Sequence, residues 1–170
     1  MLGLGKLGAR AAGVAKAFGM KVIAWSQNLT PERCKEVGSE YVSKDDLFRD
    51  ADVVTIHLQL SDRTRNLITA KELGLMKKSA YLVNTSRGPI VEEKALLDAL
   101  NKKQIAGAGL DVFDVEPLPL DHPYRKMDTV VITPHLGYVS QQNYDKYYPD
   151  IVENIRGFLD GKPVRVIAPR

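Results

Sequence analysis

Apolar residues recur along the chain at helical and strand-like spacings in turn. From Lys6 to Phe18 the apolar positions fall at helical intervals, and Gly19 is placed to end that helix. Val53 to Ile56 is rich in β-branched residues and is typical of a parallel strand that is buried on both faces. Other short apolar runs predict strands over residues 21–24, 81–83, 105–110 and 130–132.

Helix-starting signals separate these strands. Thr30 followed by Pro31 is an N-cap with a first-turn proline, Ser43 resembles a helix start, and Thr69 with Glu72 fits the capping box. Further helices are predicted over residues 92–100 and 141–160. The sustained alternation predicts a Rossmann-like α/β fold, a doubly wound parallel sheet in three layers.

The last predicted helix contains Pro149, which should kink it or begin a second helix there. Gly161 and Pro163 mark its end. Tyr144, Tyr147 and Tyr148 on this segment favour packing or a subunit contact over catalysis.

The chain begins with a glycine pattern. Gly3, Gly5 and Gly8 match G-x-G-x-x-G, in which glycine allows a tight turn, close approach of a pyrophosphate, and close packing of helix on strand. The expected ligand is a dinucleotide. Only Met1 and Leu2 precede the pattern, so the first strand is truncated, and we expect a mobile or displaced loop with weakened binding.

Composition narrows the class of protein. The 170 residues are 44% hydrophobic, enough for a core of ordinary size in one domain. A net charge of +3 without a long basic run predicts no nucleic-acid partner. Cys34 is the single cysteine and favours apolar packing in a reducing compartment, and no stretch has membrane-spanning character. We expect a soluble, cytoplasmic protein with no metal site.

Polar residues that follow the predicted strands carry the candidate chemistry, because ligands of parallel α/β sheets bind at the carboxyl ends of strands. Arg87, Glu116 and His135 occupy three such positions. Histidine exchanges protons near neutrality with a pKa of about 6.5, a carboxylate beside it favours the imidazolium, and arginine binds carboxylates bidentately. These three residue types describe a site for a 2-keto acid. Taken singly, Arg87 could be a surface arginine and Glu116 an ordinary loop carboxylate.

Four ordered motifs closely resemble the D-isomer-specific 2-hydroxyacid dehydrogenase family. The motifs are Gly3-Leu4-Gly5-Lys6-Leu7-Gly8, Val83-Asn84-Thr85-Ser86-Arg87-Gly88, Gly109-Leu110-Asp111-Val112-Phe113 through Glu116-Pro117, and Thr133-Pro134-His135-Leu136-Gly137. The resemblance covers nearly the whole chain but corresponds to the nucleotide-binding domain alone. It implies that residues 1–140 form this domain and that residues 141–170 return toward a substrate domain that the chain lacks.

The resemblance also implies a role for each matching residue. Arg87 would bind the substrate carboxylate, His135 would be the general acid/base, and Glu116 would pair with His135. Asp111 would contact the nicotinamide end of the cofactor. The expected cofactor-binding positions are Gly3, Gly5, Lys6, Leu7, Gly8, Ser26, Gln27, His57, Thr64, Thr85, Ser86, Asp111 and Gly137. His57 is interpreted as a structural or cofactor-lining residue, and His122 as a cap of its own loop.

Two positions depart from the family pattern. Ser26 stands where NAD-preferring members have an acid that takes the ribose hydroxyls, and the following Gln27 and Asn28 are neutral. The cofactor is therefore NAD or NADP, with NADP permitted rather than demanded. Gln59 stands where the family often has proline.

Two functions remain open at this stage. The first is an NAD(P)-dependent dehydrogenase of a small 2-keto or 2-hydroxy acid, which as a family member would usually form a homodimer. The second is a non-catalytic dinucleotide-binding or regulatory module, or an inactive fragment of such an enzyme, since the chain lacks the substrate domain.

Overall fold

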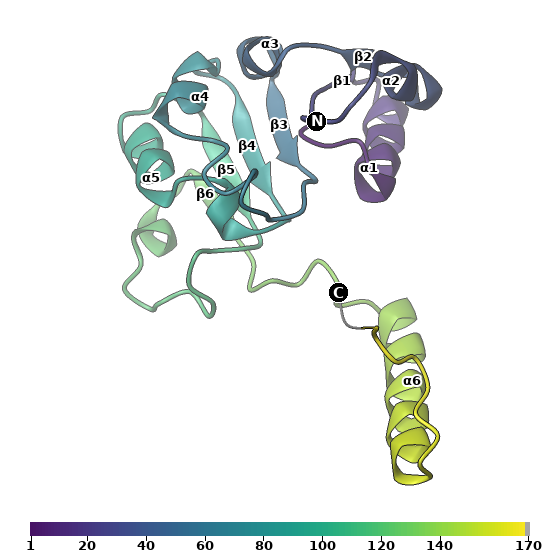
Figure 1. Ribbon diagram of the computed structural model, residues 1–170. Coiled ribbons are helices and arrows are strands. Elements are labelled where there is room, and N and C mark those ends of the chain that lie inside the picture. Colours follow the sequence, from purple (N-terminus) through teal and green to yellow (C-terminus); the bar gives the residue numbers. More distant parts are fainter. Residues whose placement is uncertain (169–170) are drawn as a thin grey trace. The chain divides into compact units, whose positions relative to one another are not determined.

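The computed structural model describes residues 1–168 and divides the chain into two compact units, one from Met1 to His135 and one from Leu136 onward. The first unit contains α1 (Lys6–Ala17), β1 (Ile23–Ala24), α2 (Pro31–Val37), β2 (Glu40–Tyr41), α3 (Lys44–Asp50), β3 (Val53–Ile56), α4 (Ala70–Leu75), β4 (Tyr81–Asn84), the 3₁₀-helix η1 (Gly88–Ile90), α5 (Glu93–Asn101), β5 (Gly107–Leu110), the 3₁₀-helix η2 (Pro123–Lys126) and β6 (Val130–Ile132) (Figure 1). The second unit contains α6 (Gln141–Leu159).

The strands form a parallel sheet in two parts. β3, β4, β5 and β6 pair in that order, and β1 pairs with β2. Leu2 joins the two parts through parallel bridges to Trp25, next to β1, and to Ile56 of β3. The full order is therefore β2, β1, the Leu2 segment, β3, β4, β5, β6. The chain first adds parallel strands on one side of Leu2 and then on the other, as it does in dinucleotide-binding folds. The predicted Rossmann-like parallel α/β fold is confirmed.

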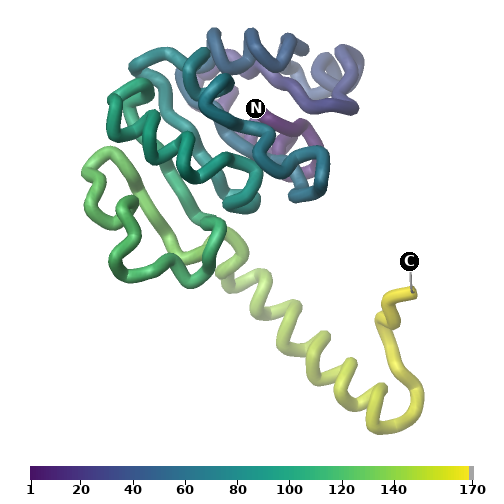
Figure 2. The backbone as a smooth tube through the Cα atoms, turned by 60° about the vertical axis from the view of Figure 1, so that its left-hand side comes forward, coloured from purple at the N-terminus to yellow at the C-terminus, as the bar shows by residue number. Residues whose placement is uncertain are grey.

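The amino-terminal segment lies inside the first unit, between neighbouring strands (Figure 2). The backbone N–H of Leu2 donates to Thr55 O at 2.9 Å, and its carbonyl accepts from His57 N–H at 2.8 Å. Gly3 N–H donates to Trp25 O at 2.9 Å. The beginning of the glycine pattern is thus held in the sheet on both sides, and the expectation of a displaced loop is wrong.

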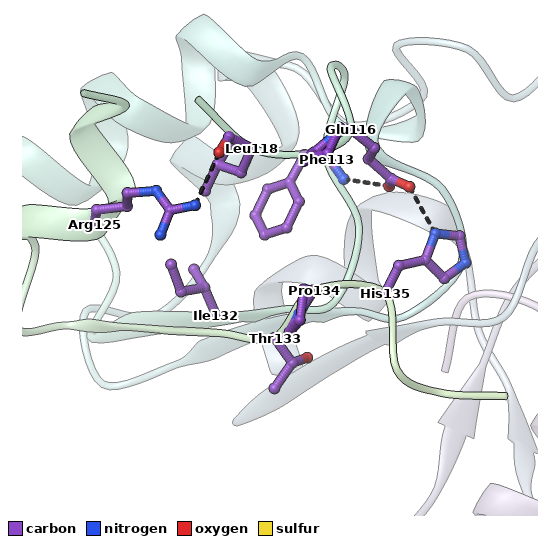
Figure 3. Close-up of a pocket in the computed structure, with 9 residues that line it drawn as sticks. Phe113, Glu116, Leu118, Arg125, Ile132, Thr133, Pro134 and His135 are labelled. Atoms are coloured by element: carbon purple, nitrogen blue, oxygen red, sulfur yellow. Dashed lines mark hydrogen bonds and ion pairs between the residues drawn. The ribbon is translucent and has the colours of Figure 1, made fainter. Parts of the chain in front are cut away.

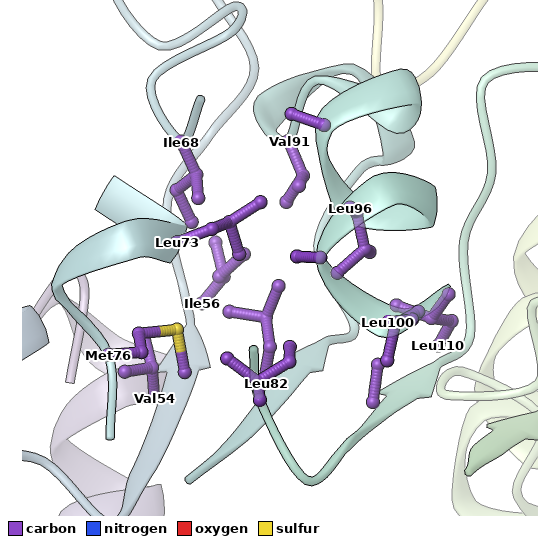
Figure 4. Close-up of a cluster of buried hydrophobic side chains, with 14 of the residues drawn as sticks. Val54, Ile56, Ile68, Leu73, Met76, Leu82, Val91, Leu96, Leu100 and Leu110 are labelled. Atoms are coloured by element: carbon purple, nitrogen blue, oxygen red, sulfur yellow. The ribbon is translucent and has the colours of Figure 1, made fainter. Parts of the chain in front are cut away.

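The main core lies between the strands and the helices α3, α4 and α5. Val54 and Ile56 of β3 and Leu82 of β4 are fully buried, and they face Leu73 of α4 and Leu96 of α5 (Figure 4). Each such side chain contributes about 1.5–3 kcal/mol through the apolar area it removes from water. A smaller cluster under α1 and α2 includes the buried Ala12 and Cys34, which confirms the packing role predicted for the cysteine.

The opposite face of β3 to β6 is only partly covered. Val53 is 37% exposed, Tyr81 51% and Val131 71%, while their strand neighbours are buried or half-buried. The prediction that Val53 to Ile56 is buried on both faces is therefore wrong for the first unit taken by itself. Periodicity could not reveal this, because β-branched runs have the same composition whether one face or both are covered.

Local capping agrees with the sequence. The Thr30 and Ser43 hydroxyls accept backbone N–H groups of α2 and α3, and Thr69 with Glu72 forms the predicted capping box of α4. His122 accepts Tyr124 N–H at 3.3 Å and so caps its loop as predicted. The short strand β2 was not predicted.

The second unit is mainly one helix. α6 continues through Pro149, so the alternative that a second helix begins there is wrong. The Tyr144 and Tyr148 rings pack with centroids 5.6 Å apart, and Arg165 pairs with Asp150 at 2.8 Å. Several large apolar side chains on this helix are exposed; Phe158, for example, is 76% exposed.

The buried carboxylate of Glu72 generates a stability prediction. It accepts Lys44 Nζ at 2.9 Å, Thr69 N–H at 2.9 Å and the Thr69 hydroxyl at 2.7 Å. Burial alone would raise the pKa of Glu72, but these hydrogen bonds and the Lys44 charge outweigh burial and lower the pKa to about 2. A lowered pKa in the folded state contributes stability above the unfolded value of 4.5, and this is lost as the pH falls toward 2.

We expect Glu72→Gln to reduce the free energy of unfolding by about 2–3 kcal/mol at neutral pH and to flatten its decline between pH 4.5 and 2. Urea unfolding across this pH range measures both effects. Glu36→Gln is the matched control, because the Glu36 side chain is 65% exposed in its ion pair with Arg33 and should change stability by less than about 1 kcal/mol. Equal unfolding curves for the two variants would contradict the assignment.

Candidate functional site

The centre of the site is a hydrogen-bonded histidine and carboxylate. His135 Nδ1 lies 2.7 Å from Glu116 Oε2, and Glu116 Oε1 accepts the Phe113 backbone N–H at 2.9 Å (Figure 3). Partial burial acts to raise the pKa of Glu116, but hydrogen bonds from His135 and Phe113 and the charges of His135 and Arg87 lower it below its usual value. The carboxylate is therefore ionised at neutral pH.

His135 is held in an uncommon backbone conformation. It follows β6, its backbone φ is 56°, and its N–H donates to Thr133 O at 3.0 Å. Positive φ is rare for residues other than glycine and concentrates at functional sites. The side chains of His135 and Glu116 are 34% and 33% exposed, so the pair remains accessible to a small molecule.

Arg87 comes from the turn after β4. The buried Asn84 amide donates to Arg87 O at 2.9 Å and accepts Ser86 N–H at 3.0 Å, which fixes this turn from beneath. Gly88 follows directly, and a Cβ there would lie 2.1 Å from the Phe113 carbonyl carbon, so only glycine lets this turn approach the chain that carries Glu116. The exposed Arg87 guanidinium acts electrostatically on Glu116. Of the three predicted catalytic residues, Glu116 and His135 are in direct contact, and Arg87 acts on Glu116 through its charge.

Asp111 and Ser86 are polar residues held by hydrogen bonds at the carboxyl ends of the strands. Asp111 directly follows β5 and is 6% exposed; its carboxylate accepts the Thr133 hydroxyl at 2.5 Å, and its backbone N–H donates to Asn84 O at 3.0 Å. Ser86 donates its hydroxyl to Ile56 O at 2.8 Å and so ties the end of β4 to the end of β3. Thr85 lies exposed beside it.

A mainly apolar cavity of about 500 Å³ adjoins the Glu116–His135 pair. Arg125 lies at the far end from His135, where its guanidinium donates to Leu118 O at 2.8 Å and Pro119 O at 2.9 Å (Figure 3). The remaining lining residues are Phe113, Pro117, Leu118, Ile132, Thr133 and Pro134. Neither Arg125 nor Asn84 was predicted as part of the site. The signal for Asn84 was a polar residue ending an apolar strand.

The glycine loop has the geometry of a phosphate cradle. Gly3 has φ +92°, and a Cβ on Gly8 would lie 2.2 Å from Gly3 O, so both positions require glycine. Gly5 caps α1, and a Cβ built on it would meet no atom within 4 Å. Lys6 and Leu7 form the exposed first turn of α1, where backbone N–H groups and the helix dipole favour an anion.

The other predicted cofactor positions lie in three places: after β3, at a second cavity, and in the second unit. His57 follows β3, is half-buried, and lies 3.1 Å from the Thr55 hydroxyl through Nε2; burial lowers its pKa, aided by the amino-terminal charge. A second cavity, of about 450 Å³, is lined by Ser26, Gln27 and Thr64 among others. Gly137 belongs to the second unit and is described only within it.

Two kinds of feature were not found in the part of the chain that the structure describes. No group of three or more His, Cys, Asp or Glu side chains is placed to hold a metal ion among residues 1–168. No described helix is both long enough and apolar enough to cross a membrane.

Comparison with known proteins gives relatives across nearly the whole chain. It is 45% identical to the glyoxylate reductase of Aeropyrum pernix over 95% of this chain and 48% of that protein. It is 42% identical to the D-3-phosphoglycerate dehydrogenase of Synechocystis over 97% of this chain and 30% of that protein. The chain spans about half the length of the first relative and less of the second.

Solved structures agree with this likeness. The D-isomer specific 2-hydroxyacid dehydrogenase of Lactobacillus delbrueckii ssp. bulgaricus, in its NAD complexed form, matches with a TM-score of 0.80 and 33% identity over 98% of this chain and 54% of that one. An acyclic imino acid reductase in complex with NADPH and D-arginine matches with a TM-score of 0.78 and 33% identity over 98% and 52% of the two chains.

The decisive match is to a family and covers both the glycine loop and the His135 motif. Residues 1–137 match the family described as D-isomer specific 2-hydroxyacid dehydrogenase, NAD binding domain. The chain belongs to the D-isomer specific 2-hydroxyacid dehydrogenase family, of which it contains the NAD binding domain.

Proposed function

We propose that this chain is the cofactor-binding part of an NAD(P)-dependent oxidoreductase that moves hydride reversibly between nicotinamide and a small 2-keto or 2-hydroxy acid. The observation that carries the proposal is the Glu116–His135 pair, 2.7 Å apart, with the charge of Arg87 acting on Glu116. The names of its relatives, glyoxylate reductase and D-3-phosphoglycerate dehydrogenase, support a substrate of this chemical class.

The residues present fit a dinucleotide. Open space at Gly5 and the tight approach of Gly8 to Gly3 leave room for a pyrophosphate at the start of α1. When bound, the nicotinamide supplies or accepts the hydride. The residues we propose to hold the cofactor are Gly3, Gly5, Lys6, Leu7, Gly8, Ser26, Gln27, His57, Thr64, Thr85, Ser86, Asp111 and Gly137, and Ser26 in place of an acid permits NADP.

The protein groups then act on the substrate. Arg87 binds its carboxylate through two parallel hydrogen bonds and orients the keto group. His135 donates a proton to the keto oxygen during reduction and takes one from the hydroxyl during oxidation. Glu116 orients the imidazole through its short hydrogen bond to Nδ1, and its negative charge stabilises the positive charge that the ring carries as an acid. His135 and Arg87 also stabilise negative charge that develops on the oxygen.

We further propose a cytoplasmic homodimer. Exposed aromatic side chains on α6, with Tyr147 46% and Tyr148 64% exposed, support a subunit contact there. The single buried thiol of Cys34 is consistent with a reducing compartment.

Replacement of His135 tests the proton-transfer role. We expect His135→Gln to lower glyoxylate- or pyruvate-dependent oxidation of NAD(P)H by about 10²- to 10⁴-fold, because the proton donor is lost. Cofactor affinity, measured by nicotinamide fluorescence, should change less than about twofold. His122→Gln is the control, since His122 serves as a local cap. Undiminished turnover by His135→Gln would refute the assignment, and cofactor binding without turnover by the unaltered chain would favour a binding module.

Replacement of Glu116 tests the electrostatic role. We expect Glu116→Gln to lower the rate of keto-acid reduction about tenfold or more, because the imidazolium loses its ionised partner. Rates of reduction by the variant and by the unaltered chain measure the loss, and an undiminished rate in the variant would contradict this role.

The glycine cradle is tested by adding one methyl group. We expect Gly8→Ala to weaken binding of both NADH and NADPH about tenfold or more, because its Cβ would lie 2.2 Å from Gly3 O and force the loop to move. Gly13→Ala makes the same change within α1, where a Cβ meets no atom within 4 Å, and should leave affinity unchanged. Fluorescence titration with a parallel thermal melt measures both. Unchanged affinity in a folded Gly8→Ala protein would contradict the cradle.

A further inference from the structure

The second cavity lies between the ends of β1 and β3. One wall is the segment from Trp25 to Asn28 that follows β1, and the other is formed by residues of the 58–67 segment that follows β3. Its volume is about 450 Å³. The glycine loop begins between these same two strands, so the proposed dinucleotide would extend from the loop into this cavity with its adenosine half.

The charge of this cavity is set by one residue. Among the lining residues, all within the described part of the chain, Arg63 is the only one with an ionisable side chain. Ser26, Gln27 and Asn28 on the facing wall are neutral, and no carboxylate lines either wall. An acid at this place would bind ribose hydroxyls and repel a phosphate, whereas an arginine attracts one.

The backbone that presents Arg63 is held by its neighbour Thr64. The Thr64 hydroxyl donates to Gln59 O at 2.7 Å and accepts Ser61 N–H at 2.8 Å. The backbone N–H groups of Thr64 and Arg65 both donate to Ser61 O, at 3.0 and 2.9 Å. The turn is therefore ordered before any ligand arrives, which lowers the entropic cost of placing the arginine.

The donors of Arg63 are available for a ligand. Its guanidinium makes no hydrogen bond or ion pair with any of residues 1–168. Two other cations near this part of the fold are already engaged. Arg33 binds Glu36 at 2.9 Å and Leu4 O at 3.4 Å, and Lys44 binds Glu72 at 2.9 Å and Leu67 O at 2.8 Å.

We propose that Arg63 binds the 2′-phosphate of NADP(H) and makes this chain prefer NADP(H) to NAD(H). The cation reaches the phosphate from the turn after β3, across the cavity from the neutral Ser26, Gln27 and Asn28. This inference rests on the proposed function, because it assumes that the adenosine half of a nicotinamide dinucleotide occupies the cavity.

The test is fluorescence titration of the unaltered 170-residue chain and two variants with NADPH and NADH. The unaltered chain should bind NADPH more tightly, and Arg63→Gln should weaken NADPH binding about tenfold to a hundredfold while changing NADH affinity less than about twofold. Arg65→Gln is the matched control, because it removes the same charge from the same turn but Arg65 does not line the cavity. Competition by adenosine 2′,5′-bisphosphate should exceed competition by adenosine 5′-monophosphate only when Arg63 is present.

The possible outcomes distinguish a failure of the Arg63 role from a failure of the proposed function. Equal affinity for the two cofactors, tighter binding of NADH, or an equal loss of both in Arg63→Gln would overturn the role of Arg63 and leave a dinucleotide-binding protein. If Arg65→Gln weakened NADPH binding as much as Arg63→Gln does, the effect would come from the net charge of the turn, and the specific role of Arg63 would be overturned. Binding of neither cofactor by the unaltered chain would refute the cofactor assignment together with this inference.

Discussion

The hydrogen bonds of Leu2 hold the two parts of the sheet together. One residue donates to Thr55 and accepts from His57 on one side, while its neighbours Met1 and Gly3 bond Trp25 on the other. This connection aligns β1 with β3, and therefore aligns the two walls between which the glycine loop opens. Gly3 turns the chain out of the sheet at φ +92° immediately afterwards, so the position of the glycine loop depends on the pairing of Met1, Leu2 and Gly3.

The rest of the site follows from the parallel register of the sheet. β3, β4, β5 and β6 are paired so that Ile56, Asn84, Leu110 and Ile132 end at one edge. Each strand end is tied to its neighbour by a polar contact, such as Ser86 Oγ to Ile56 O or Thr133 N–H to Leu110 O. Arg87 and His135 are 48 positions apart in the sequence, and the register of the sheet brings both near the Glu116 carboxylate.

Local rules explain which parts of this arrangement could be predicted from the sequence. Thr30, Ser43 and Thr69 cap helices through atoms two or three residues away, so their patterns carry the whole signal. The strand Glu40–Tyr41 could not be predicted, because it is two residues long, exposed, and defined only by its pairing with β1. The exposure of Tyr81 and Val131 was missed for a related reason, because whether a strand face is covered depends on elements distant in the sequence.

The same distinction applies within the site. Glu116 and His135 were predicted because their motifs place them at strand ends, where topology leaves little choice of position. Cofactor preference is different, because Ser26 after β1 and Arg63 on the facing wall of the cavity are 37 positions apart in the sequence. Ser26 by itself shows only that no carboxylate at this position repels a phosphate. An attractive charge has to come from a residue on the other wall of the cavity. Arg63 lies on that wall because the fold brings the two segments together, and the hydrogen bonds of Thr64 hold the turn that carries it.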